Sequence, residues 1–142
     1  MDEPTETPAE LRFVPDRRYT ALAGAGCAVA VIAAYVTGDP AGRLLAATAA
    51  VVLAAYVAAD LVFTPRVVVS AGGVVINAPF LRARLPWAAV ERVRADTRLR
   101  LGLRATTLEI DAGATLAVLS RRAIGADPEA AAERILAFRP PG

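Results

Sequence analysis

The stretch that decides the fold lies at residues 19–63 and reads YTALAGAGCAVAVIAAYVTGDPAGRLLAATAAVVLAAYVAADLVF. It contains two apolar segments, 19–37 and 44–63, joined by a short polar break that holds Asp39 and Arg43. Because a helix rises about 1.5 Å per residue, about 20 residues cross the hydrocarbon of a bilayer. The pattern therefore predicts a transmembrane helical hairpin over residues 19–64.

The charges that flank the two segments predict how the hairpin is oriented. Arg17 and Arg18 precede the first segment, Arg66 follows the second, and the break between the segments holds one arginine beside an acid. Loops rich in Arg stay on the cytoplasmic side of a membrane. We therefore expect a multi-pass protein of the plasma membrane with both termini in the cytosol.

Asp60 is the one acidic residue of the second segment. A carboxylate within a membrane is a functional candidate, but Asp60 lies about four residues from the predicted inner boundary, where the penalty for a charge is small. We expect Asp60, Arg17, Arg18 and Arg66 to anchor the chain at the membrane interface. A proton or ion relay is disfavoured because no second intramembrane acid continues the path.

Small residues recur at every fourth position in both segments. Such residues allow two helix backbones to approach closely, so we expect these faces to form the contact within the hairpin. The predicted packing residues are Gly26, Ala30, Ala34, Ala46, Ala50, Ala54 and Ala58.

The residues outside the hairpin divide into a tail and a β-rich domain. Residues 1–18 form an acidic tail and a juxtamembrane segment, and 1–11, with two prolines and little to bury, are expected to be disordered. From residue 65 the pattern changes to alternating strands separated by glycine turns. Trp87 is a predicted core residue, and Asp127 with Pro128 predicts the start of a closing helix.

Six or seven short strands followed by one amphipathic helix predict an α+β fold. We expect residues 65–142 to form a small antiparallel β-barrel or bent sheet capped by a C-terminal α-helix. This order is that of pleckstrin-homology (PH) domains, and the pattern by itself also fits other β-plus-helix folds.

Four motifs carry a resemblance to a known family. They are the strand–Gly–strand unit at 67–75, the P-W-x-x-V turn within 85–93, and the segments 107–113 and 125–129. Together they resemble the actinobacterial PH domain-containing membrane proteins, the family of the low molecular weight protein antigen 6. The resemblance covers roughly residues 12–139. It implies a two-helix hairpin followed by a short PH-like domain, and it supplies no catalytic residues.

Arginines alternate along the predicted strands and are the candidate binding residues. They form three pairs, namely Arg82 with Arg84, Arg92 with Arg94, and Arg98 with Arg100. The two members of each pair are two residues apart, so they project from the same face of their strand. If the faces coincide, the six guanidiniums form one basic surface near the bilayer, suited to anionic lipid headgroups or a protein partner. The alternative is a solvated sheet face. The candidates are Arg82, Arg84, Arg92, Arg94, Arg98 and Arg100.

The composition argues against several kinds of chemistry. Histidine is absent, and the single cysteine, Cys27, lies inside an apolar segment, which disfavours histidine catalysis, a zinc site and disulfides. Glu109 and Asp111 lie on a predicted strand beside a turn and are expected at the surface. No aromatic residues interleave with the basic pairs, so nucleic acid is not an expected partner. We expect no catalytic residue, no metal and no cofactor, and hence no enzyme.

Two functional hypotheses follow. The first is a membrane-anchored, non-enzymatic PH-like module at the inner leaflet, which scaffolds or docks to anionic lipid or protein. The second is an accessory subunit of a larger membrane protein complex, which packs through its Ala/Gly-rich helices.

Overall fold

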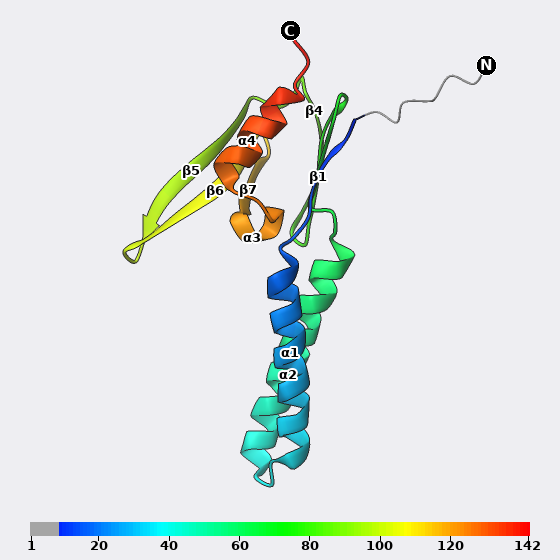
Figure 1. The fold of residues 1–142 in the computed structure, drawn as a ribbon, viewed down its shortest axis with the longest axis vertical. Helices are drawn as coiled ribbons and strands as arrows, with labels where there is room; N and C mark the ends of the chain where they lie inside the picture. The colour runs from blue at the N-terminus through cyan, green and yellow to red at the C-terminus, as the bar shows by residue number, and fades with distance from the viewer. Residues whose placement is uncertain (1–8) are drawn as a thin grey trace, which may run out of the picture. The chain divides into compact units, whose positions relative to one another are not determined.

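The helices and strands of the protein are taken from a computed structural model, which describes residues 9–142 (Figure 1). Residues 16–64 form one unit, and the β-rich residues that precede and follow them form the other. The helices are α1 (Arg17–Val36), α2 (Pro40–Val62), α3 (Arg121–Ile124) and α4 (Pro128–Ala137). The strands are β1 (Leu11–Phe13), β2 (Val67–Ser70), β3 (Gly73–Ala78), β4 (Leu81–Pro86), β5 (Arg92–Arg100), β6 (Leu103–Asp111) and β7 (Leu116–Ser120).

Helices α1 and α2 form an antiparallel hairpin, and both are long and apolar enough to cross a membrane. Asp16 caps α1 by accepting a hydrogen bond from the Arg18 amide at 3.0 Å. Asp39 caps α2 by accepting one from the Gly42 amide at 2.7 Å, with Pro40 in the first helical turn. Because an Asp cap followed by Pro favours a helix start, α2 begins four residues before the predicted position.

The contacting face of the hairpin differs in part from the predicted one. On α1, Gly26 lies so close to α2 that an added Cβ would be 3.3 Å from the Leu53 side chain. On α2, Ala50 is buried, and its carbonyl accepts a 3.4 Å hydrogen bond from the Cys27 thiol. Ala30, Ala34 and Ala46 are half-buried, whereas Ala54 and Ala58 are exposed.

The predicted packing of Ala54 and Ala58 within the hairpin is therefore wrong. Each four-residue step turns about 40° past a full helical turn, so a stripe of fourth residues drifts off the contact line. Leu53 and Asp60 continue the contact instead, the second through a 2.9 Å hydrogen bond from the Thr20 hydroxyl to the Asp60 carboxylate. Asp60 is 5% exposed and links the two helices, a role that the sequence did not predict.

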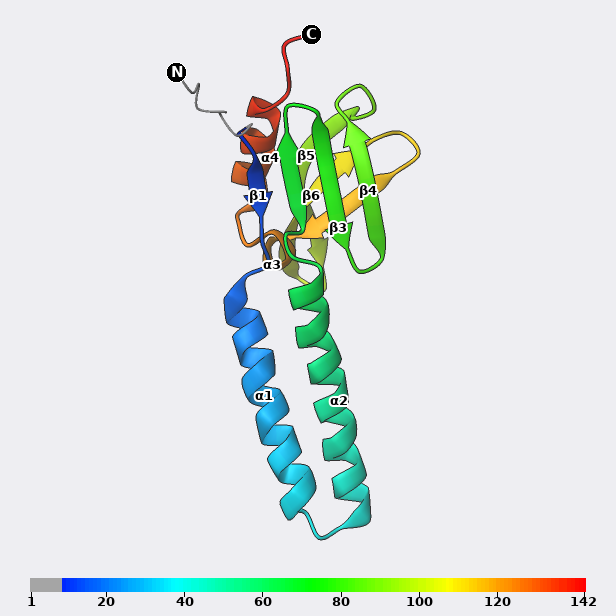
Figure 2. The ribbon, with the colours of Figure 1, turned by 90° about the vertical axis from the view of Figure 1, so that its right-hand side faces the viewer.

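The β-rich unit contains two antiparallel sheets. One has the strand order β1-β2-β3-β4, seen face-on in Figure 2, and the other has the order β5-β6-β7. Within the described residues the sheets do not close into a barrel, so the barrel, one of the two predicted forms, is wrong, and the fold is mixed α+β with two antiparallel sheets. Helix α4 contacts β5 and β6 and lies between them and β1 (Figure 1). Its buried Ala131 and Ile135 belong to the hydrophobic core of the unit.

Strand β1 belongs to the sheet rather than to a tail. Leu11 and Phe13 are buried and face Val69 and Val67 across the β1–β2 ladder. The predicted disorder of residues 1–11 is wrong at Leu11, while residues 1–8 lie outside the described part of the chain. An apolar–Arg–apolar triplet has the alternation of a half-buried strand, which is why this segment pairs with β2.

The core confirms two predictions from the sequence. Trp87 is 8% exposed, and its indole N–H donates to the Ser70 carbonyl at 2.9 Å. Asp127 caps α4 by accepting from the Ala130 amide at 3.3 Å, and Pro128 occupies the first turn. Gly73, at φ +148°, allows β3 to approach β4 so closely that an added Cβ would clash with the Leu85 carbonyl oxygen.

Candidate functional site

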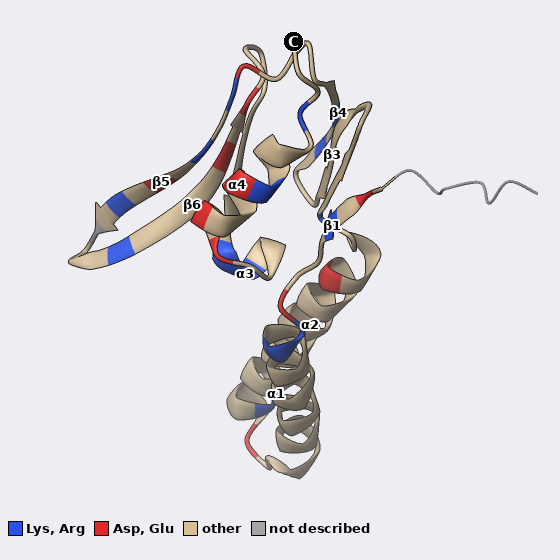
Figure 3. Ribbon diagram, turned by 45° about the horizontal axis from the view of Figure 1, so that its top comes forward, with Lys and Arg blue, Asp and Glu red and all other residues tan. Residues whose placement is uncertain are grey.

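The candidate arginines lie on two different sheets (Figure 3). Arg82 and Arg84 are on β4, and Arg92, Arg94, Arg98 and Arg100 are on β5. Arg82 and Arg84 alternate with residues of β4 that pack on the core, and Arg92 and Arg94 flank the buried Val93, so these exposed arginines project from the outer face of their own sheet. The single basic surface that the sequence predicted therefore does not form. Parity along a strand shows which residues share a face, but not to which sheet the strand belongs.

Two arginines of β5 are held by an acidic residue of β6. Arg94 donates from Nε and Nη2 to Glu109 Oε2 at 3.0 and 2.9 Å, and Arg98 donates from Nη2 to Glu109 Oε1 at 3.2 Å. Glu109 is 3% exposed, so its predicted place at the surface is wrong. The cause is that β6 is the middle strand of its sheet, where neighbouring side chains cover it on both sides.

Arg98 also binds Asp96, two residues away on the same strand. Its Nε donates to Asp96 Oδ2 at 2.6 Å. This hydrogen bond lowers the pKa of the Asp96 carboxyl and raises the pKa of the Arg98 guanidinium. The outer face of the β5–β7 sheet thus carries arginines that the protein's own acids already neutralise.

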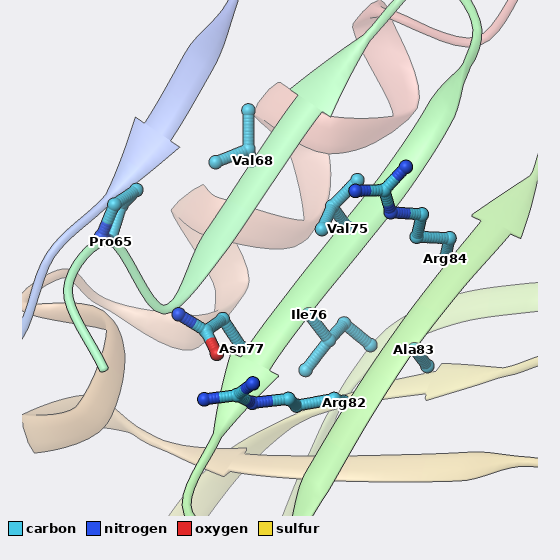
Figure 4. Close-up of a pocket in the computed structure, with 8 residues that line it drawn as sticks. All are labelled: Pro65, Val68, Val75, Ile76, Asn77, Arg82, Ala83 and Arg84. Carbon is cyan, nitrogen blue, oxygen red and sulfur yellow. The ribbon is translucent and has the colours of Figure 1, made fainter. Parts of the chain in front are cut away.

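The outer face of the β1–β4 sheet carries a groove of about 480 Å³ (Figure 4). Its middle is apolar, because Val68 of β2 and Val75 of β3 face each other across the ladder. Arg84 lies opposite Val75, and Arg82 lies opposite Asn77. The lining residues are Pro65, Val68, Val75, Ile76, Asn77, Arg82, Ala83 and Arg84.

The groove combines cationic donors with an apolar floor. Its lining contains two arginines and no acidic residue. Arg82 and Arg84 stand two residues apart on one strand, so their backbones are about 7 Å apart and both can reach one anionic group. Asn77 adds an amide that can donate and accept. This arrangement suits a phosphate or carboxylate that is attached to an apolar group.

A third arginine of this face, on β1, is paired with an acid. Arg12 of β1 lies opposite Val68, and its Nη2 is 2.9 Å from Glu10 Oε2. The groove arginines were among the sequence candidates, whereas Pro65, Val68, Val75 and Asn77 were not. Only the pairing of β2, β3 and β4 brings these four residues beside Arg82 and Arg84.

The predicted interface anchors have different environments. Arg17 and Arg18 are exposed at the start of α1. Arg66 is 6% exposed within the β-rich unit, where its amide donates to the Phe13 carbonyl and its carbonyl accepts from the Asn77 amide. The burial of Arg66 contradicts a role in which its side chain reaches headgroups. Its backbone instead links β1 and β3 at the start of β2.

No group of three or more His, Cys, Asp or Glu side chains that could hold a metal ion is found in residues 9–142.

The family comparison matches a model described as the bacterial PH domain to residues 64–141, which is more than half of the chain. Searches of curated proteins and of solved structures gave no match.

Proposed function

The chain belongs to the bacterial PH domain family, and on this premise we propose that it is a membrane-anchored, non-enzymatic PH module that docks on anionic lipid headgroups. Helices α1 and α2 are the proposed anchor in the plasma membrane, with both termini in the cytosol and the domain at the inner leaflet. The groove with Arg82 and Arg84 is the proposed docking site.

The surface of the helices supports the anchor. Large apolar side chains such as Leu45, Val51 and Leu61 are about 70% exposed on α2, which an aqueous solvent disfavours and a bilayer favours. Only residues 14–16 link β1 to α1, and only residues 63–66 link α2 to β2. Four extended residues span at most about 14 Å, so an inserted hairpin keeps the domain close to the headgroups.

The observation that carries the docking proposal is the local charge of the groove. Arg82 and Arg84 line a concavity without an acid, whereas Arg94 and Arg98 are neutralised by Glu109 and Asp96. A basic side chain near an anionic leaflet contributes about 1 kcal/mol to the binding free energy. Salt screens this attraction when the charges are farther apart than the Debye length. The apolar floor beside the arginines, on β3 and β2, accepts the glycerol and the upper acyl carbons of the same lipid.

To test the proposal, short-chain phosphatidylglycerol is titrated into the full chain in zwitterionic micelles, and calorimetry measures the binding. Changing both Arg82 and Arg84 to Gln should weaken binding by about 10–30-fold at low salt, because about 2 kcal/mol of attraction is lost. The matched control changes Arg92 and Arg121, both exposed, to Gln and removes the same charge elsewhere. Equal weakening in both variants would mean that net charge acts and that the groove does not.

A second candidate function rests on the exposed small residues of α2. Ala54 and Ala58 face away from α1 and leave a narrow strip where another helix can approach closely. This strip supports the alternative that the protein is an accessory subunit of a larger membrane complex. Crosslinking of the full chain in its native membrane, with and without Ile at both positions, tests that alternative.

A further inference from the structure

The hairpin of β5 and β6 ends in the sequence Arg98-Leu99-Arg100-Leu101-Gly102-Leu103-Arg104. β6 pairs with β7 only over Thr107–Asp111, whereas the β5–β6 ladder continues to the pair of Arg100 and Leu103. The last part of the hairpin is therefore a two-stranded ribbon that extends past β7 (Figure 1). We name residues 99–103 the hairpin tip.

Leu101 occupies a backbone position that disfavours leucine. Leu101 and Gly102 connect the two strands with φ of +50° and +78°, as in a two-residue turn with left-handed central residues. Asn, Asp or Gly is the usual first residue of such a turn, because a side chain like that of leucine crowds the following carbonyl. The Leu101 side chain is 103% exposed, so no contact within the described chain compensates for the strain. Backbone strain of this kind concentrates at functional sites.

Two further leucines flank the turn and are also exposed. Leu99 is 69% exposed and Leu103 is 74% exposed. Leu99 lies opposite Arg104, and Leu103 lies opposite Arg100, so the two leucines project from opposite faces of the ribbon. The tip therefore presents apolar side chains at its apex and on both faces. A single exposed leucine is ordinary, but three at one protruding end indicate a surface that becomes buried against a partner or a membrane.

The charge around the hairpin tip indicates what it enters. Residues 97–108 contain three arginines, at positions 98, 100 and 104, and no acidic residue. Arg98 is bound by Asp96 and Glu109, while Arg104 is exposed on β6. Leucines at the end of a ribbon, with Arg98 and Arg104 behind them, match the layers of an anionic bilayer, whose acyl chains lie below a plane of phosphates.

We propose that the hairpin tip inserts into the interfacial layer of an anionic bilayer and gives the domain a second membrane contact. The leucines enter the upper acyl region, and Arg104 remains at the phosphates. This proposal rests on the proposed function in one respect, namely that the hairpin of α1 and α2 holds the domain beside a bilayer. A bilayer is favoured over a second protein because the tip is a protruding end with basic flanks.

The test uses the full chain in nanodiscs of phosphatidylcholine with phosphatidylglycerol. Cys27→Ala removes the natural cysteine, and an environment-sensitive fluorophore is attached at Leu101→Cys. The matched control is Ala114→Cys, an exposed position in the turn at the other end of β6. Val52→Cys, exposed in the middle of α2, reports whether the anchor spans the bilayer. The quencher is a lipid with a nitroxide near the top of its acyl chain.

Insertion predicts a blue shift and a loss of fluorescence at position 101 but not at 114. The loss should be smaller without phosphatidylglycerol and when Leu99 and Leu103 are both changed to Ser. A water-like, unquenched signal at 101 overturns the proposal, and a quenched signal at 52 in the same sample shows that the anchor nevertheless stands. A blue shift at 101 without lipid quenching also overturns it, because the tip then contacts protein.

One further variant distinguishes the groove proposal from the tip proposal. With Arg82 and Arg84 changed to Gln, quenching at position 101 should persist. Failure of the groove proposal therefore leaves the tip proposal intact, and failure at the tip leaves groove binding measurable by the lipid titration. The emission of Trp87, the single tryptophan, which lies in the core of the domain, shows that each variant is folded.

Discussion

Nη2 of Arg94 lies 2.9 Å from Glu109 Oε2, and the Glu109 carboxylate also accepts a hydrogen bond from Arg98. This relationship divides the arginines of the domain into two groups. Those on β5 that bind Glu109 serve the stability of their sheet. Those on β4 line a groove whose lining contains no acid, which is why docking is proposed on the β1–β4 sheet.

Replacing Glu109 by Gln should destabilise the domain. The carboxylate is buried, and its loss removes charge-assisted hydrogen bonds with two guanidiniums that are themselves about half exposed. We expect the free energy of unfolding to fall by about 1–2 kcal/mol, because solvent compensates part of each lost bond. Urea unfolding followed by Trp87 emission measures the change, with Glu133→Gln, an exposed acid on α4, as the control. Equal stability of the two variants would contradict a stabilising role for Glu109.

Enlarging Ala50 should separate the two helices, whereas enlarging Ala54 should not. Ala50 is buried against α1 beside Cys27, and Ala54 is exposed. The measurement is the rate at which a maleimide alkylates Cys27, the single cysteine, in micelles of the full chain. Ala50→Ile should raise this rate, and Ala54→Ile should leave it near that of the natural protein. An equal rise in both variants would show that the predicted stripe, which contains both residues, forms the contact rather than the observed face.

Replacing Leu101 by Asn should stabilise the domain, although it removes a leucine that is proposed to enter the membrane. Asn tolerates the left-handed turn that strains leucine, so we expect the domain to gain about 1 kcal/mol in its free energy of unfolding. Urea unfolding in zwitterionic nanodiscs, again followed by Trp87, measures this gain. Leu103→Asn, one strand position past the turn, is the control that should bring no gain. A loss of stability in the Leu101 variant would mean that leucine is retained there for folding.

The parts of this fold that the sequence predicted are those governed by local pattern. The two helices follow from long apolar runs, and the start of α4 follows from Asp127 and Pro128. The strand at Leu11–Phe13 was missed because its partner, Val67–Val69, is separated from it by the whole hairpin. A three-residue strand carries too little pattern to be recognised without that partner.

The candidate site could be predicted only in part, for the same reason. Alternation placed Arg82 with Arg84, and Arg92 with Arg94, correctly on shared faces. It did not show that the two pairs belong to different sheets, nor that Glu109 lies between Arg94 and Arg98. The burial of Glu109 and the lining of the groove depend on cross-strand register, which a single sequence does not contain.

The measurement that tests the docking groove most directly is nuclear magnetic resonance of the full chain in nanodiscs with and without phosphatidylglycerol. We expect the amide signals of Val68, Val75 and Asn77 to shift when the anionic lipid is present, and high salt to reduce these shifts. The amide signals of Val93 and Leu119, in the β5–β7 sheet, should stay unchanged. Unchanged signals in the groove, or shifts confined to the β5–β7 sheet, would contradict the claim that the β1–β4 face docks on the membrane.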